Sequence, residues 1–188
     1  MKKFCMFMVV LMAFGAAVAA AQPVAGKKFE LGTAVSFFSI KEDGSEGGSW
    51  GYLTVPVRFG YFIWKGLEIE PEIQVTIPVN SEGKGDTTYF LLGNLTYNFA
   101  TSGKLVPFIG GGAGFGNGIP FFLGLVEGSS DEKTFAFDGV VGLKYIIAKV
   151  AALRAEYRFN RFTWDAPWMI EKEKGTFHQF FVGICLFF

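Results

Sequence analysis

The sequence predicts an all-β protein, an eight-stranded antiparallel up-and-down β-barrel whose strands cross a membrane. Three observations predict this fold. The last segment, 175–188, places large apolar residues at every second position and ends on the aromatic Phe188. Strand-like segments near the length of about ten residues that a tilted membrane strand needs recur along the chain. The connections between them alternate between short and long, which is typical of membrane barrels.

The N-terminus predicts a cleaved secretory signal peptide over residues 1–21, which leaves 22–188 as a single barrel domain. Lys2 and Lys3 form a short positive region, and an apolar segment over 4–18 follows before a group of small residues. This order is that of a signal peptide, and the apolar segment is too short for a membrane helix.

Composition excludes several classes of protein. Without the predicted signal peptide, the chain holds 15 Lys and Arg residues against 17 Asp and Glu residues, a net charge of −2. A nucleic-acid-binding protein would instead show a basic face. Cys185 is then the one cysteine left, so an internal disulfide is excluded. The chain is 51% hydrophobic but has no second apolar run long enough for a membrane helix, which suits strands that alternate between lipid and lumen.

Eight segments are expected to form the strands. In chain order they are 28–41, 49–62, 67–78, 87–99, 105–116, 134–147, 151–162 and 175–188. The short connections are 63–66, 100–104 and 148–150, and the longer, polar ones are 42–48, 79–86, 117–133 and 163–174.

Alternation within the strands assigns charged residues to the barrel interior. In 67–78, every second residue is apolar, and Glu68, Glu70 and Glu72 occupy the positions between. A charge on the lipid face would cost about 2–4 kcal/mol at the midplane, so these side chains must face inward. The same argument extends to the second, sixth and seventh segments. The expected lumen network comprises Arg58, Glu68, Glu70, Glu72, Asp138, Lys144, Arg154, Glu156 and Arg158.

This network predicts a closed lumen. Reflecting Arg58 across the turn 63–66 places it beside Glu70 or Glu72, and we expect Arg154 or Arg158 to reach this group or Glu156 from the far wall. Eight strands leave an interior that is only wide enough for side chains. Mixed-sign buried charges generally neutralise one another. A path for protons or ions, or a pair of catalytic carboxylates, is the alternative interpretation.

Two short motifs resemble a known family. The run VPFIGGGAGFG over 106–116 resembles the glycine-rich strand of the small eight-stranded outer-membrane barrels, the OmpA/OmpX/opacity-protein group, and LRAEYRF over 153–159 resembles their penultimate strand. The resemblance implies a Gram-negative-type outer membrane, with lipid and lipopolysaccharide around the barrel. It also implies that Phe188 belongs to a signal for the barrel-assembly machinery. The family includes adhesins and stress-induced barrels, so it implies no single function.

Charge predicts the orientation. The long loops carry 11 acidic and 4 basic residues, whereas the short turns carry Lys65, Lys104 and Lys149 and no acidic residue. We expect the long loops outside the cell and both termini in the periplasm.

The sequence predicts no enzymatic activity and no cofactor or metal. The resemblance extends to barrels that modify lipid A, one of which uses His, Ser and Glu. Here the one histidine, His178, has Phe180 where such a deacylase would have serine. The glycines of 110–114 lack the Lys-Ser/Thr of a phosphate loop, so we expect them to make room for bulky neighbours in the lumen.

The loop 117–133 contains an apolar run that includes Phe121, Phe122 and Leu123. Either the flanking strands extend outward or the run dips into the outer leaflet, or these residues contact an extracellular partner.

We therefore expect a monomeric, non-enzymatic barrel with a structural or surface-interaction role. Three alternatives stay open: a narrow channel for ions or small solutes, a lipid A-modifying enzyme, and a soluble periplasmic barrel with a lipid-binding interior. The last would need polar outer faces, and the alternation gives the reverse.

Overall fold

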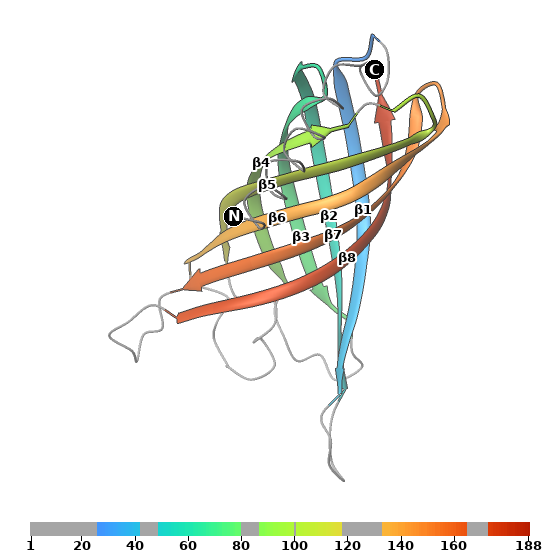
Figure 1. The fold of residues 1–188 in the computed structure, drawn as a ribbon. Helices are drawn as coiled ribbons and strands as arrows, with labels where there is room; N and C mark the ends of the chain where they lie inside the picture. Colours follow the sequence, from blue (N-terminus) through green and yellow to red (C-terminus); the bar gives the residue numbers. More distant parts are fainter. Residues whose placement is uncertain (1–25, 42–48, 80–86, 100, 118–132, 165–172) are drawn as a thin grey trace, which may run out of the picture.

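The computed structural model describes residues 26–41, 49–79, 87–99, 101–117, 133–164 and 173–188. Eight strands form a closed barrel in which each strand pairs antiparallel with its sequence neighbours, and the last strand pairs with the first (Figure 1). The predicted fold class is therefore confirmed. Among the described residues, no helix is long and apolar enough to cross a membrane.

The strands match the predicted segments closely. They are β1 Phe29–Lys41, β2 Ser49–Trp64, β3 Leu67–Pro78, β4 Thr88–Asn98, β5 Leu105–Asn117, β6 Lys133–Ala148, β7 Ala151–Trp164 and β8 Glu173–Phe187. β2 continues to Trp64 at the turn end, and at the loop end β7 and β8 stay paired as far as Trp164 and Glu173. Their ladder continues into residues that the sequence pattern had assigned to the loop.

The outer face of the barrel is apolar and the inner face is polar. On β8, every second residue from Phe180 to Leu186 is an exposed large hydrophobic residue, and Phe180 reaches 73% exposure. On β3, Ile69 and Ile73 are exposed, whereas the intervening Glu70 is buried. Successive strand residues point to opposite faces, so the exposed apolar band is the surface that lipid covers.

The turn between β2 and β3 requires glycine. Gly66 has φ +77°, a conformation that costs other residues energy. A Cβ there would also lie 2.3 Å from the Asn98 carbonyl oxygen. A register shift between Phe62 and Trp64 precedes this turn and tightens the strand into it.

The glycines of β5 make room inside the barrel, as the sequence indicated. A Cβ on Gly112 would lie 1.8 Å from Asn94 Oδ1, and one on Gly116 would lie 2.7 Å from the Phe90 ring. Both neighbours are the register partners on β4. The inward side chains of β4 therefore lie across the backbone of β5.

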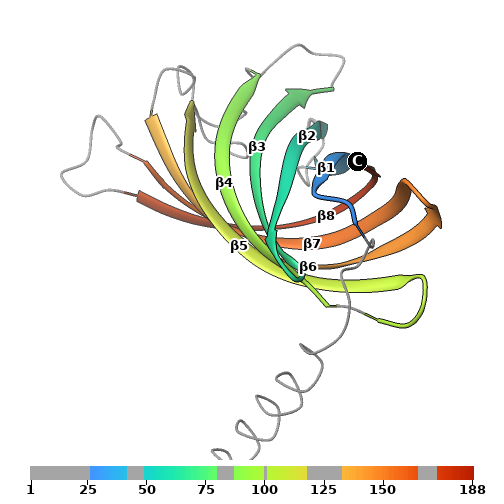
Figure 2. The same cartoon turned by 90° about the horizontal axis from the view of Figure 1, so that it is seen from above.

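The barrel closes where β8 meets β1 (Figures 1 and 2). The pairing runs from Glu30 opposite Phe187 to Val35 opposite Val182. Phe188 extends it, because its amide donates to the Phe29 carbonyl (3.0 Å) and its carbonyl accepts from the Phe29 amide (3.0 Å). The Phe188 ring packs on Phe29, 5.8 Å between centroids. The last residue thus takes part in the closing seam.

Candidate functional site: the charged interior

All nine charged residues that the sequence assigned to the lumen lie inside the barrel, each no more than 9% exposed. They project from β2, β3, β6 and β7, and their outward neighbours form the apolar surface. Glu30 on β1 joins them at 1% exposure. Applying the same alternation to 28–41 would have found it, since its neighbours Leu31, Thr33 and Val35 face outward.

Glu72 and Glu156 anchor the half of the network nearer the long loops. Arg58 Nε lies 2.7 Å from Glu72 Oε2, and its Nη2 lies 2.5 Å from Glu156 Oε1. Arg158 on β7 donates two hydrogen bonds to Glu72 across the lumen, from Nη1 to Oε1 and from Nη2 to Oε2, each of 2.7 Å. Arg58 is therefore bonded to one of the two expected carboxylates. A paired, two-bond guanidinium–carboxylate contact is among the strongest ion pairs in proteins.

Asp138 is the loosest member of this half. Its Oδ2 lies 3.3 Å from Arg158 Nη1, further than the 2.7 Å of the two Arg158–Glu72 bonds.

Arg154 and Lys144 hold the half nearer the turns. Arg154 Nη1 lies 2.6 Å from Glu70 Oε1, and its Nε lies 2.7 Å from Glu156 Oε2. Lys144 Nζ lies 2.5 Å from Glu30 Oε2 and 3.1 Å from Glu68 Oε2. Since Glu156 touches both Arg58 and Arg154, the two halves form one connected network.

Neutral donors on β4 complete the network. Thr96 Oγ1 donates to Glu70 (2.8 Å), Asn98 Nδ2 to Glu68 (2.9 Å) and Asn94 Nδ2 to Glu72 (3.3 Å). The described interior holds six carboxyl groups and four cationic side chains, so these donors satisfy oxygens that cations alone would leave. The sequence analysis missed them, although their alternation with Leu91, Leu95 and Tyr97 gives the signal.

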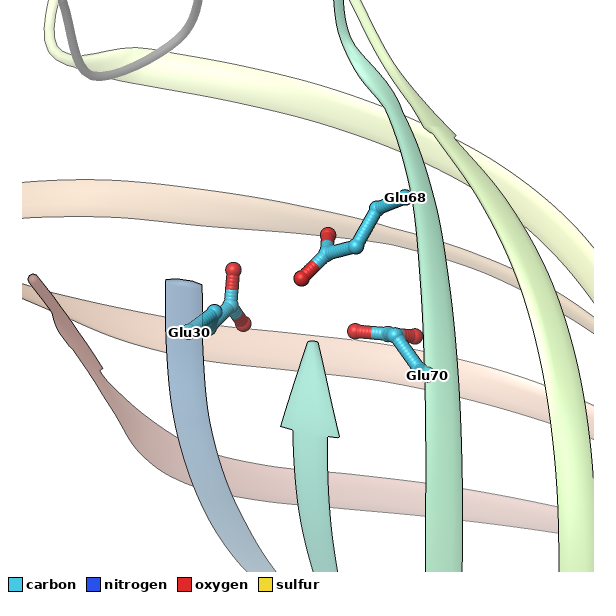
Figure 3. A group of neighbouring side chains, drawn as sticks. All are labelled: Glu30, Glu68 and Glu70. Carbon is cyan, nitrogen blue, oxygen red and sulfur yellow. The ribbon is translucent and has the colours of Figure 1, made fainter. Parts of the chain in front are cut away.

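Three carboxylates lie close enough together to bind a cation. Oxygens of Glu30, Glu68 and Glu70 lie within 4.8 Å of one another, and Figure 3 shows the three side chains converging from β1 and β3. Lys144 already bonds two of them, and Arg154 bonds Glu70 and lies 3.3 Å from Glu30. Lys144 and Arg154 therefore pair with the three carboxylates of this cluster.

Room for the cluster comes from Gly60. A Cβ at this position would lie 1.8 Å from Glu68 Oε1. The missing side chain on β2 lets the Glu68 carboxylate lie over the strand between β3 and β1.

Apolar layers cover the network on both sides. Towards the turns, Ala152, Cys185 and Phe187 form a buried cluster with Phe62 and Ile146 packed against it. Lys144 and Arg154 face the Phe108 ring from 5.5 and 4.4 Å. These aromatic faces attract cations and shield the ion pairs from water.

The layer towards the long loops is also apolar. Buried Phe90, Leu92, Ala136 and Phe162 pack together, with Phe177 against them. Between this layer and the charges lies a belt of hydrogen bonds, in which Gln179 accepts from Asn160 and donates to Thr54, each at 3.2 Å. The interior is thus layered from apolar to charged to apolar along the barrel.

His178 lies on the outward face, away from the charged interior. Its Nδ1 is hydrogen-bonded to the Tyr157 hydroxyl, and its ring packs on Phe159 at 5.4 Å. Neither contact is with a serine or a carboxylate, so the described surroundings of His178 do not form a hydrolytic triad.

Several expectations fall outside the described residues. These are the signal peptide over 1–21, the apolar residues Phe121, Phe122 and Leu123, and most of the four long loops.

A closed antiparallel barrel with an apolar outer band and a polar interior is the architecture of a transmembrane β-barrel. The chain belongs to the family of the outer membrane protein beta-barrel domain, which matches residues 6–185. This confirms the predicted resemblance and assigns the protein to the barrels of the outer membrane.

Solved structures show the same fold. Neisserial surface protein A (NspA) is similar with a TM-score of 0.62 and 16% identity, over 85% of this chain and 96% of that one. The N-terminal β-barrel domain of Pseudomonas aeruginosa OprF is similar with a TM-score of 0.53 and 13% identity, over 86% and 98%. No curated protein matches the chain.

Proposed function

We propose that the protein is a non-enzymatic outer-membrane barrel whose lumen is closed by the ion-paired network and which acts through its outer surface. The layered interior carries this proposal. A solute crossing the barrel would have to break contacts such as Arg158–Glu72 and displace the apolar layers at Phe187 and Phe162. Separating a buried ion pair costs several kcal/mol, so the resting barrel is a plug.

The distribution of charge along the chain supports a proposed orientation. The turns of the described chain carry the exposed Lys65, Lys104 and Lys149, whereas the acidic residues found in connections belong to the other four connections of the sequence. The proposed arrangement has the long loops outside the cell and both termini in the periplasm. In this arrangement the loops have the structural or surface-interaction role, and Phe121, Phe122 and Leu123 would contact an extracellular partner.

Electrical recording tests the closed lumen. The purified barrel inserted into a planar bilayer should show no steady conductance, because ion pairs and apolar layers of the described strands occupy the interior. The double variant Glu70→Ala and Arg154→Ala removes a bonded pair from the middle of the network. Recording its conductance in the same bilayer tests whether loss of this pair opens the lumen. Steady conductance steps from the wild-type barrel would favour a narrow channel and overturn the plug.

A further inference from the structure

Basic side chains gather on the outward face at the loop end of β6, β7 and β8. Among strand residues whose side chains the structure describes, the exposed charged ones are Lys133, Arg161 and Lys174, and all three are basic. Lys65, Lys104 and Lys149 at the other end lie in three separate turns. Arg161 and Lys174, in contrast, lie on two paired strands.

The register brings four potential donors together. Arg161 lies directly opposite Thr176, and Lys174 and His178 flank Thr176 on the same face of β8. Diagonal neighbours on paired strands lie roughly 7–8 Å apart, within reach of long side chains. Within the described ranges, no carboxylate pairs with Arg161 or Lys174. One anion can therefore meet both cations at once.

Two neighbouring side chains hold the His178 ring beside these cations. The Tyr157 hydroxyl bonds its Nδ1, and Phe159 packs on its ring. Either atom of this contact can be the donor; where the hydroxyl donates to Nδ1, the ring proton lies on Nε2, which is then a donor. The ring is thus oriented before any ligand arrives.

The cluster lies where the apolar band ends. Phe159 precedes Arg161 by two residues on β7, and Phe180 follows His178 by two on β8, both exposed on the outward face. A molecule at this border would lay apolar chains along Phe180 and Val182 and place an anionic head among the donors. That is the geometry of a membrane lipid with a negatively charged headgroup.

We propose that Arg161, Lys174, Thr176 and His178 bind a phosphate of a phosphorylated glycolipid in the outer leaflet. A phosphate monoester carries nearly two negative charges and three acceptor oxygens, which matches two cations and two further donors. The phosphodiester of a phospholipid offers one charge and fewer free oxygens. The choice of leaflet rests on the proposed orientation, with the long loops outside.

Binding in detergent tests the proposal. The full barrel in micelles is titrated with diphosphorylated lipid A and followed by native mass spectrometry. The double variant Arg161→Gln and Lys174→Gln should bind about ten- to a hundredfold more weakly, the size expected for losing charge-assisted hydrogen bonds. The matched pair Lys104→Gln and Lys149→Gln, at the turn end, should leave the affinity unchanged. Arg161→Lys, which keeps the charge, should retain most of the binding.

Three outcomes would overturn the lipid site. They are equal affinity of the two double variants, binding of phosphatidylglycerol as tight as that of lipid A, and equally tight binding of inorganic phosphate. Unchanged heat-modifiable migration shows that the variants fold. The micelle assay depends neither on orientation nor on a closed lumen. Orientation is measured separately: a Lys65→Cys barrel that reacts with an impermeant thiol reagent on intact cells would place the cluster in the inner leaflet.

Discussion

Arg158→Ala is expected to lower the free energy of unfolding of the barrel by on the order of 3–5 kcal/mol, the typical cost of leaving buried charge unpaired. The change removes both bonds to Glu72 and the contacts with Asp138 and Glu156. Among the described residues, Arg58 would then be the one cation left to bond Glu72, which two guanidinium groups share in the wild type. The temperature at which the folded band disappears from a heat-modifiable gel should fall, and urea unfolding in lipid vesicles should give the magnitude.

The same strand offers a matched control. Arg161 lies three residues further along β7 but is exposed on the outward face. Arg161→Ala should change the stability by no more than about 0.5 kcal/mol, as surface substitutions usually do. Adding Glu72→Gln to Arg158→Ala should recover part of the loss, because one fewer negative charge is left unpaired. Equal destabilisation by Arg158→Ala and Arg161→Ala would contradict the ion-paired interior.

Removal of Phe188 is expected to leave most of the protein unassembled in the periplasm. The residue provides backbone hydrogen bonds with Phe29 at the seam between β8 and β1, and its ring contacts Phe29 and Phe59. The resemblance to small outer-membrane barrels also implies that Phe188 belongs to a signal for the barrel-assembly machinery. Fractionation of membranes, combined with the heat-modifiable shift, measures the assembled fraction.

Two substitutions separate the contributions of Phe188. Phe188→Ala keeps the backbone bonds and removes the ring, whereas Phe188→Tyr keeps an aromatic terminus. We expect Phe188→Tyr to assemble like the wild type and Phe188→Ala to assemble poorly. Normal insertion of the truncated chain would remove the support for an assembly role of this residue.

Sequence alternation predicted the faces of the strands but not the choice of partners. The period of two placed Glu68, Glu70 and Glu72 inside because each is flanked by apolar residues. Reflection across the turn placed Arg58 beside Glu70 or Glu72, and the observed register partner is Glu72. The register shift between Phe62 and Trp64 lies at the end of β2, just before the turn, and cannot be read from the alternation.

Contacts across the lumen depend on features that alternation does not contain. Arg158 lies 86 residues from Glu72 in the sequence, and their meeting depends on the stagger of all the strands between them. The donors Asn94, Thr96 and Asn98 are neutral, so the cost of lipid exposure that singled out the charges did not flag them. Alternation also did not indicate the role of Gly60, which is evident only from the position of the Glu68 carboxylate over it.

A distance between Arg158 and Glu72 in a lipid bilayer tests the closed, ion-paired lumen most directly. Solid-state NMR on the labelled barrel can measure the separation of the Arg158 guanidinium nitrogens and the Glu72 carboxyl carbon. We expect direct contact, consistent with the two N–O distances of 2.7 Å. A fully folded barrel in which these groups lie further apart than about one strand spacing, ~5 Å, would contradict it.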